Sequence, residues 1–120
     1  MQDYKSLKIW QHSHNFTLDI YRITARFPKD EQRGLVSQMR RSSYSIPTNI
    51  AEGCGRRTKE DFAHFLQMSL GSANEIEYQL LLSADLKYIT KEQYDSLSMK
   101  INYIRRMIIN FIAKVKGSPQ

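Results

Sequence analysis

The stretch that decides the fold is "KEQYDSLSMKINYIRRMIINFIAKV", residues 91–115. Its apolar side chains recur at alternating intervals of three and four residues, which places them on one face of an α-helix. Thr90 and Gln93, just before them, have the spacing of an N-terminal capping box. The stripe comprises Tyr94, Leu97, Ile101, Ile104, Ile108, Phe111 and Val115.

Three further stripes of the same kind occupy residues 9–27, 31–53 and 58–83. No segment alternates with the period of two that a half-buried strand requires. Four helices joined by short loops predict an all-α protein, an antiparallel up-down four-helix bundle. We expect a single domain over residues 1–120, with a short disordered tail from about residue 117.

Charge is unevenly distributed along this basic chain. The net charge is +6, with +5 in residues 1–60, −3 in residues 61–90 and +4 in residues 91–120. A basic protein suits an anionic partner such as nucleic acid, although a mixed solvated surface explains the same numbers. We expect a cytoplasmic protein with no membrane segment, because no apolar run is long enough and Cys54 is the only cysteine.

Residues suited to catalysis or metal binding are scattered. His12 and His14 point about 200° apart on a helix, so they cannot share a metal. Asp61 and His64 have the spacing of a di-iron motif, but the second such pair that this site needs is missing. Cys54 has no histidine near it in the sequence. We therefore expect no enzyme activity, no metal and no cofactor.

Residues 40–57, "RRSSYSIPTNIAEGCGRR", place Pro47 inside the second predicted helix. Proline removes one backbone N–H and costs ~3 kcal/mol in a helix interior. We expect the helix to bend there yet continue on both sides, with the hydroxyls of Ser42, Ser43 and Tyr44 helping to satisfy the freed carbonyl.

Two other residues of this stretch have expected structural roles. Asn49 lies near the buried stripe, where a bonded amide would fix the register of the helices; the alternative is that it faces solvent. Gly53 ends the stripe and is small enough to let another helix approach closely.

The apolar surface exceeds what one bundle core uses. Leu80, Leu81 and Leu82 point in three directions around a helix, and Met107 and Ile109 lie off the main stripe. Exposed apolar patches usually mark an interface, so we expect self-association. A bundle with a broad core and a few exposed leucines is the alternative.

The segment "GLVSQMRRSSYSIPTNIAEGCGR", residues 34–56, resembles the signature of the 23S rRNA intervening-sequence proteins. Further similar segments are "LKIWQ" at 7–11, "IYRIT" at 20–24, "FPKDE" at 27–31 and "FLQMSLGSANEIEYQL" at 65–80. Ser13 departs from the alanine that is frequent in the family, which is a small-for-small change.

The resemblance implies a small antiparallel four-helix bundle, encoded within bacterial 23S rRNA genes or elsewhere in the genome. Some members carry a ribosomal-protein label. A similar protein, the accessory subunit of diversity-generating retroelements, forms a homopentamer that binds nucleic acid and a reverse transcriptase. By analogy we expect a non-catalytic, pentameric accessory protein that binds nucleic acid, with RNA favoured, and has a reverse transcriptase or a ribosomal component as partner. A protein-binding scaffold without nucleic acid is the alternative.

The expected nucleic-acid contacts are two arginine pairs and the cations of the last helix. Adjacent helical residues point about 100° apart, so one of Arg40 and Arg41 is expected to face a partner and the other a neighbouring helix. Arg56 and Arg57 either reach a ligand or pair with Glu52, Glu60 or Asp61. The full set is Arg40, Arg41, Arg56, Arg57, Lys100, Arg105 and Arg106.

Overall fold

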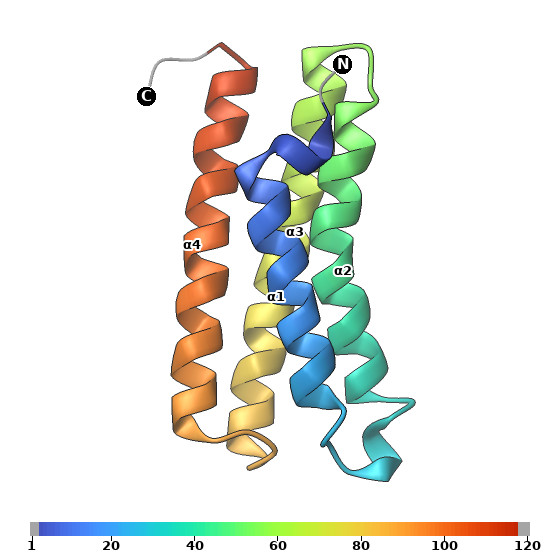
Figure 1. Cartoon of the computed structure of the whole chain (residues 1–120), viewed down its shortest axis with the longest axis vertical. Coiled ribbons are helices and arrows are strands. Elements are labelled where there is room, and N and C mark those ends of the chain that lie inside the picture. Colours follow the sequence, from blue (N-terminus) through green and yellow to red (C-terminus); the bar gives the residue numbers. More distant parts are fainter. Residues whose placement is uncertain (1–2, 118–120) are drawn as a thin grey trace.

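The chain folds into four long helices that run alternately up and down, as a computed structural model that describes residues 3–117 shows (Figure 1). Two 3₁₀ helices precede α1 and α2. The elements are η1 (Tyr4–Ser6), α1 (Lys8–Thr24), η2 (Lys29–Glu31), α2 (Leu35–Cys54), α3 (Lys59–Asp85) and α4 (Lys91–Val115). No strand occurs in residues 3–117, so the predicted all-α, antiparallel up-down bundle is confirmed. The expected tail lies outside the described residues.

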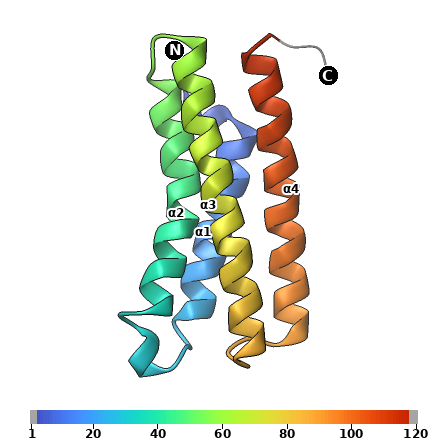
Figure 2. The same ribbon diagram turned by 180° about the vertical axis from the view of Figure 1, so that it is seen from behind.

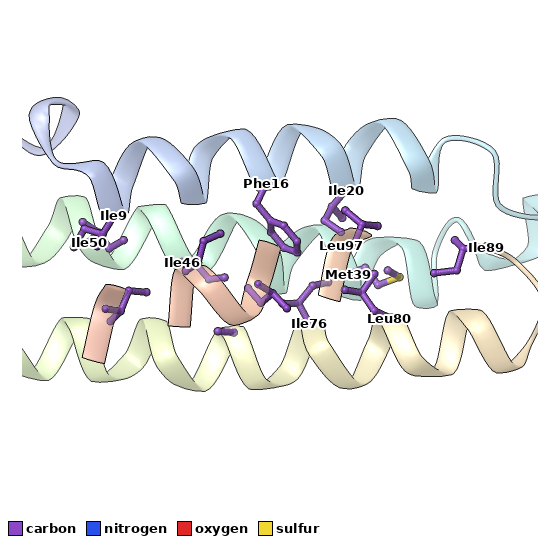
Figure 3. Close-up of a cluster of buried hydrophobic side chains, with 14 of the residues drawn as sticks. Ile9, Phe16, Ile20, Met39, Ile46, Ile50, Ile76, Leu80, Ile89 and Leu97 are labelled. Carbon is purple, nitrogen blue, oxygen red and sulfur yellow. The ribbon is translucent and has the colours of Figure 1, made fainter. Parts of the chain in front are cut away.

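The helices lie in the order α1, α2, α3, α4 around a shared core, and both views place α1 opposite α3 (Figures 1 and 2). The core is a column of buried aliphatic side chains with Phe16 and Met39 among them (Figure 3). Ile101, Ile104 and Ile108 supply the α4 side, so the predicted stripe of residues 91–115 is confirmed. Its first and last members, Tyr94 and Val115, are only partly buried.

The helix boundaries follow from local chemistry. Thr90 caps α4 through the expected capping box with Gln93, and the Thr58 hydroxyl accepts from the Asp61 N–H at the start of α3. The second helix begins at Leu35 rather than at residue 31. Its N-cap, Gly34, has φ −110° and ψ −107°, a backbone conformation that breaks the helical path after η2.

One end of the bundle is fastened by contacts between its two turns. The Tyr88 hydroxyl donates to Glu31 Oε2 at 2.9 Å, and the Tyr88 ring lies 5.2 Å from that of Phe27. Lys87, just before, has φ 68°, a left-handed conformation that ends α3. These contacts join the α3–α4 turn to the α1–α2 connection.

Candidate nucleic-acid interface

Arg40 links α2 to the C-terminal end of α1. Its Nε donates to Thr24 Oγ1 at 3.0 Å, and one terminal nitrogen donates to the Tyr21 carbonyl oxygen at 3.2 Å. Its guanidinium carbon lies 4.5 Å from the centroid of the Tyr21 ring. A cation is favourable at a helix C-terminus, where carbonyl groups are unpaired. Arg40 is thus the member of its pair that faces a neighbouring helix, and its partners on α1 were not foreseen from the sequence.

Arg41, Arg57 and Arg106 are exposed, and none of the three side chains has a hydrogen bond or an ion pair within residues 3–117. They come from α2, from the turn between α2 and α3, and from α4. Arg41 and Arg57 are sixteen residues apart along α2 and the turn that follows it, about 24 Å at 1.5 Å per residue, so these two do not form one cluster. These arginines have no competing carboxylate to displace before they could contact a phosphate.

Arg56 and Lys100 both have acidic partners. Arg56 lies 3.5 Å from Glu52 and stacks over the Phe65 ring at 4.6 Å, which matches the pairing alternative. Lys100 reaches from α4 to Asp19 of α1 at 2.9 Å. Exposed pairs of this kind contribute only about 0–1 kcal/mol. Both cations must leave a carboxylate before they can contact a phosphate.

Arg105 differs from its neighbour Arg106 because it is built into the α3–α4 contact. Its side chain is only 21% exposed and donates to Glu77 Oε1 at 2.7 Å and to Asn74 Oδ1 at 3.1 Å. It also donates to Asn102 on its own helix. A guanidinium that is satisfied by three acceptors has a structural role, so Arg106 is the better candidate for ligand contact.

Charge separates by helix. Helix α3 carries one lysine and five acidic residues, whereas α4 carries five basic residues and two acidic ones. Helix α3 lies behind α1 in Figure 1 and in front of it in Figure 2, with α4 and α2 on the two sides. The acidic surface is therefore concentrated on α3 and the basic surface on α4.

An apolar groove of about 820 Å³ runs between α1 and α4, the pair of neighbouring helices in least contact. The buried ring of Phe16 lies at its base, and Met99 and Tyr103 stand along it with 73% and 49% of their surface exposed. Lys100 and Arg106 line it as well. The expected spare apolar surface is thus present, and Leu81 and Ile109 add to it elsewhere.

Helix α2 continues through Pro47 without a break, as expected. The carbonyl of Ser43, which Pro47 leaves without an N–H, accepts a hydrogen bond from Thr17 Oγ1 of α1 at 3.1 Å. One turn further, the Ile46 carbonyl accepts from Ser69 Oγ of α3 at 2.9 Å. Hydroxyl groups of both neighbouring helices therefore bond the backbone of α2 around the proline.

The expectation that nearby hydroxyls of α2 satisfy this turn is wrong. Ser42 Oγ donates to the Gln38 carbonyl and Ser43 Oγ to the Arg40 carbonyl, both at 2.9 Å. These acceptors lie about one turn before the carbonyl that Pro47 leaves free. Tyr44 is exposed, and its hydroxyl has no partner within the described residues.

The structure shows the role that we expected for Gly53 but not the one that we expected for Asn49. Asn49 is half-buried, and its Nδ2 donates to the Ser45 carbonyl of the same helix at 2.9 Å, so it does not bond another helix to fix register. Gly53 is buried against α3: a Cβ there would lie 2.7 Å from Cδ1 of Phe62. The close helix approach that we expected at Gly53 is confirmed.

Groups suited to chemistry remain dispersed. Burial raises the pKa of the Cys54 thiol, which keeps it protonated and a poor nucleophile near neutral pH. Across residues 3–117, no three histidine, cysteine or acidic side chains come together in a way that would hold a metal ion. None of the helices in this part of the chain has the length and apolar character needed to cross a bilayer.

Comparison with known proteins supplies the family. The model of the 23S rRNA-intervening sequence protein family matches residues 5–110. A crystal structure of a protein of unknown function from the S23 ribosomal protein family of Bacteroides thetaiotaomicron is 32% identical in sequence, with a TM-score of 0.77 over 87% of this chain and 97% of the other. Among proteins with curated descriptions, none matches. The chain belongs to the 23S rRNA intervening-sequence protein family.

Proposed function

We propose that this chain is a non-catalytic, oligomeric accessory protein that binds nucleic acid, with RNA favoured. The observation that carries the proposal is the set of exposed, unpaired arginines on a chain with net charge +6. Arg41, Arg57 and Arg106 can each bind a phosphate without breaking an ion pair. The separation of acidic α3 from the basic helices favours one orientation of the polyanion.

The test is a salt series of RNA-binding isotherms. Replacing Arg41, Arg57 and Arg106 together by glutamine should weaken RNA binding at low salt and reduce the slope of log K against log salt by about two to three units if all three contact phosphate. The thermal midpoint should not change, because these side chains have no partner among residues 3–117.

A matched control removes the same charge elsewhere. Arg22, Lys91 and Lys100 are also exposed, but Arg22 and Lys100 share Asp19 and Lys91 is paired with Asp95. Their replacement by glutamine should alter the slope less, because these cations must leave their aspartates before they can contact a phosphate. Equal slopes for the two triple variants would mean that only total charge matters. A wild-type chain that binds no RNA at low salt would overturn the proposal.

Self-association is the second part of the proposal, and the groove between α1 and α4 supports it. Its apolar floor and exposed Met99 and Tyr103 would be covered by another copy, and its cations complement the acidic α3 of a neighbour. A contact between two different surfaces closes into a ring only when the rotation per subunit divides the circle. Five subunits is the number that the family resemblance suggests.

The same groove favours the alternative function, a scaffold that binds a protein. A reverse transcriptase or a ribosomal component is the partner that the resemblance suggests. Salt separates the two functions: RNA affinity falls steeply with salt, whereas binding of an apolar protein surface barely changes.

A further inference from the structure

A second groove, between α1 and α2, carries aromatic side chains that the proposed function does not use. It encloses about 580 Å³ around the buried Pro47 and Thr17. Five aromatic or imidazole rings line it, from η1, α1 and α2: Tyr4, Trp10, His14, Tyr21 and Tyr44.

The rings at the η1 end of this groove form a stack. The rings of Trp10 and His14 lie 4.9 Å apart and only 6° from parallel, and Tyr4 meets Trp10 edge-on at 5.1 Å. His14 is exposed and Trp10 is half-buried, so a further planar group would reach this stack from the His14 side. Aromatic faces in such an arrangement accept nucleobases by stacking, whatever the base.

The other end of the groove leads to guanidinium groups. Tyr21 and Tyr44 also line an adjoining hollow whose cations are Arg40 and Arg41. Arg40 is held over the Tyr21 ring at 4.5 Å, and Arg41 is unpaired within the described residues. The carboxylate in the groove, Glu52, is paired with Arg56 at 3.5 Å. The two hollows thus place aromatic rings next to cations. The one acidic side chain that lines them is already paired with an arginine.

The length of the stripe fits a short strand. Trp10, His14, Thr17 and Tyr21 recur at intervals of four, three and four residues along one side of α1. Trp10 and Tyr21 are about 16 Å apart along the axis, at 1.5 Å per residue. That distance holds about four to five nucleotides at the stacked spacing of 3.4 Å.

We infer that the α1–α2 groove binds single-stranded RNA, with unpaired bases stacked on Tyr44 and the Trp10–His14 pair and with a backbone phosphate at Arg41. This inference rests on the proposed RNA binding and adds the form of RNA that is recognised. A duplex keeps its bases inside the helix, so it can use the arginines but not the rings.

Trp10 is the only tryptophan in the chain, so its fluorescence reports on this groove alone. The probe is an eight-nucleotide RNA without self-complementarity, compared with an eight-base-pair RNA duplex at the same salt concentration. We expect the single strand to quench Trp10 and the duplex to leave it largely unquenched. Tyr44→Ala should weaken single-strand binding by about five-fold or more, the loss typical of one stacked base. Its duplex binding should match the wild type.

Two matched variants complete the test. Tyr44→Phe keeps the ring and should bind the single strand as the wild type does. Tyr78→Ala removes an exposed tyrosine of α3 that lines neither groove, and it should leave the single-strand affinity unchanged. If RNA binds but Trp10 is not quenched and Tyr44→Ala binds normally, the groove inference is overturned and the proposed function stands. If neither RNA binds to the wild type, both are overturned.

Discussion

Thr17 Oγ1 lies 3.1 Å from the carbonyl oxygen of Ser43, the acceptor that Pro47 leaves without its helical N–H. The same hydroxyl lies 2.9 Å from the Ser13 carbonyl, so its single hydrogen is shared between two acceptors on two helices. Thr17 and Ser43 are both buried. A proline in the interior of α2 therefore forms part of the α1–α2 contact, because α1 supplies the missing donor.

Thr17→Val should destabilise the fold by about 1–3 kcal/mol, because it leaves a buried carbonyl unsatisfied. In a Pro47→Ala background the same change should cost less, because alanine restores the backbone N–H that bonds the Ser43 carbonyl. Urea unfolding of the four proteins of this cycle measures the coupling, which we expect to be about 1 kcal/mol. Thr48→Val, at an exposed threonine on α2, is the control and should have little effect. Equal costs of Thr17→Val in both backgrounds would show that Pro47 and Thr17 are independent.

Gly53→Ala should destabilise the bundle by about 1–3 kcal/mol, the usual cost of overpacking. The new Cβ would lie 2.7 Å from Cδ1 of Phe62 and 3.2 Å from Cβ of Phe65, so α2 and α3 would have to move apart. Gly71→Ala is the matched control, because nothing lies within 4 Å of a Cβ there. It should stabilise α3 by up to about 1 kcal/mol through helix propensity. Thermal unfolding of both variants checks the opposite signs.

Arg105→Met should destabilise the protein by about 1 kcal/mol, because Glu77 and Asn74 lose their donor. Arg106→Met, one residue further on the same helix, should change stability by less than about 0.5 kcal/mol. RNA binding should show the reverse order, with the larger loss for Arg106→Met. The paired measurements are urea unfolding and RNA affinity at low salt. A larger RNA-binding loss for Arg105→Met, measured where that variant is fully folded, would place Arg105 at the ligand.

The sequence predicts the helices well because apolar periodicity is a local signal. The stripe of α4 and the cap at Thr90 needed no knowledge of the partners. The hydrogen-bond partners of the arginines, in contrast, could not be predicted from a local signal. Arg40 bonds residues 16 and 19 positions away, and Arg105 bonds residues 28 and 31 positions away on another helix. Such partners depend on how the helices are rotated against each other, which one stripe does not reveal.

The donor to Ser43 was missed for a related reason. Thr17 and Thr24 are both buried polar residues beside the apolar stripe of α1. Threonine can bond the carbonyl four residues earlier on its own helix, as Thr24 does with Ile20 at 2.6 Å. Only the packing of α1 against α2 turns Thr17 towards a second acceptor. One sequence signal would have suggested this hydrogen bond. It is a threonine beside the buried stripe of one helix, in a chain that has a proline inside another helix.

The α1–α4 groove is the contact surface of the proposed assembly. Tyr103→Glu should dissociate the oligomer, because it removes apolar contact area and sets a carboxylate against the acidic α3 of the neighbouring copy. Leu86→Glu is the control: Leu86 is similarly exposed at 44%, but it lies in the α3–α4 turn at the end of the bundle. Native mass spectrometry at micromolar concentration should show an assembled wild type and Leu86→Glu, and a monomeric Tyr103→Glu that keeps its helical circular dichroism. Assembly that survives Tyr103→Glu would place the interface elsewhere. A wild-type chain that is only monomeric at micromolar concentration would exclude the oligomer itself.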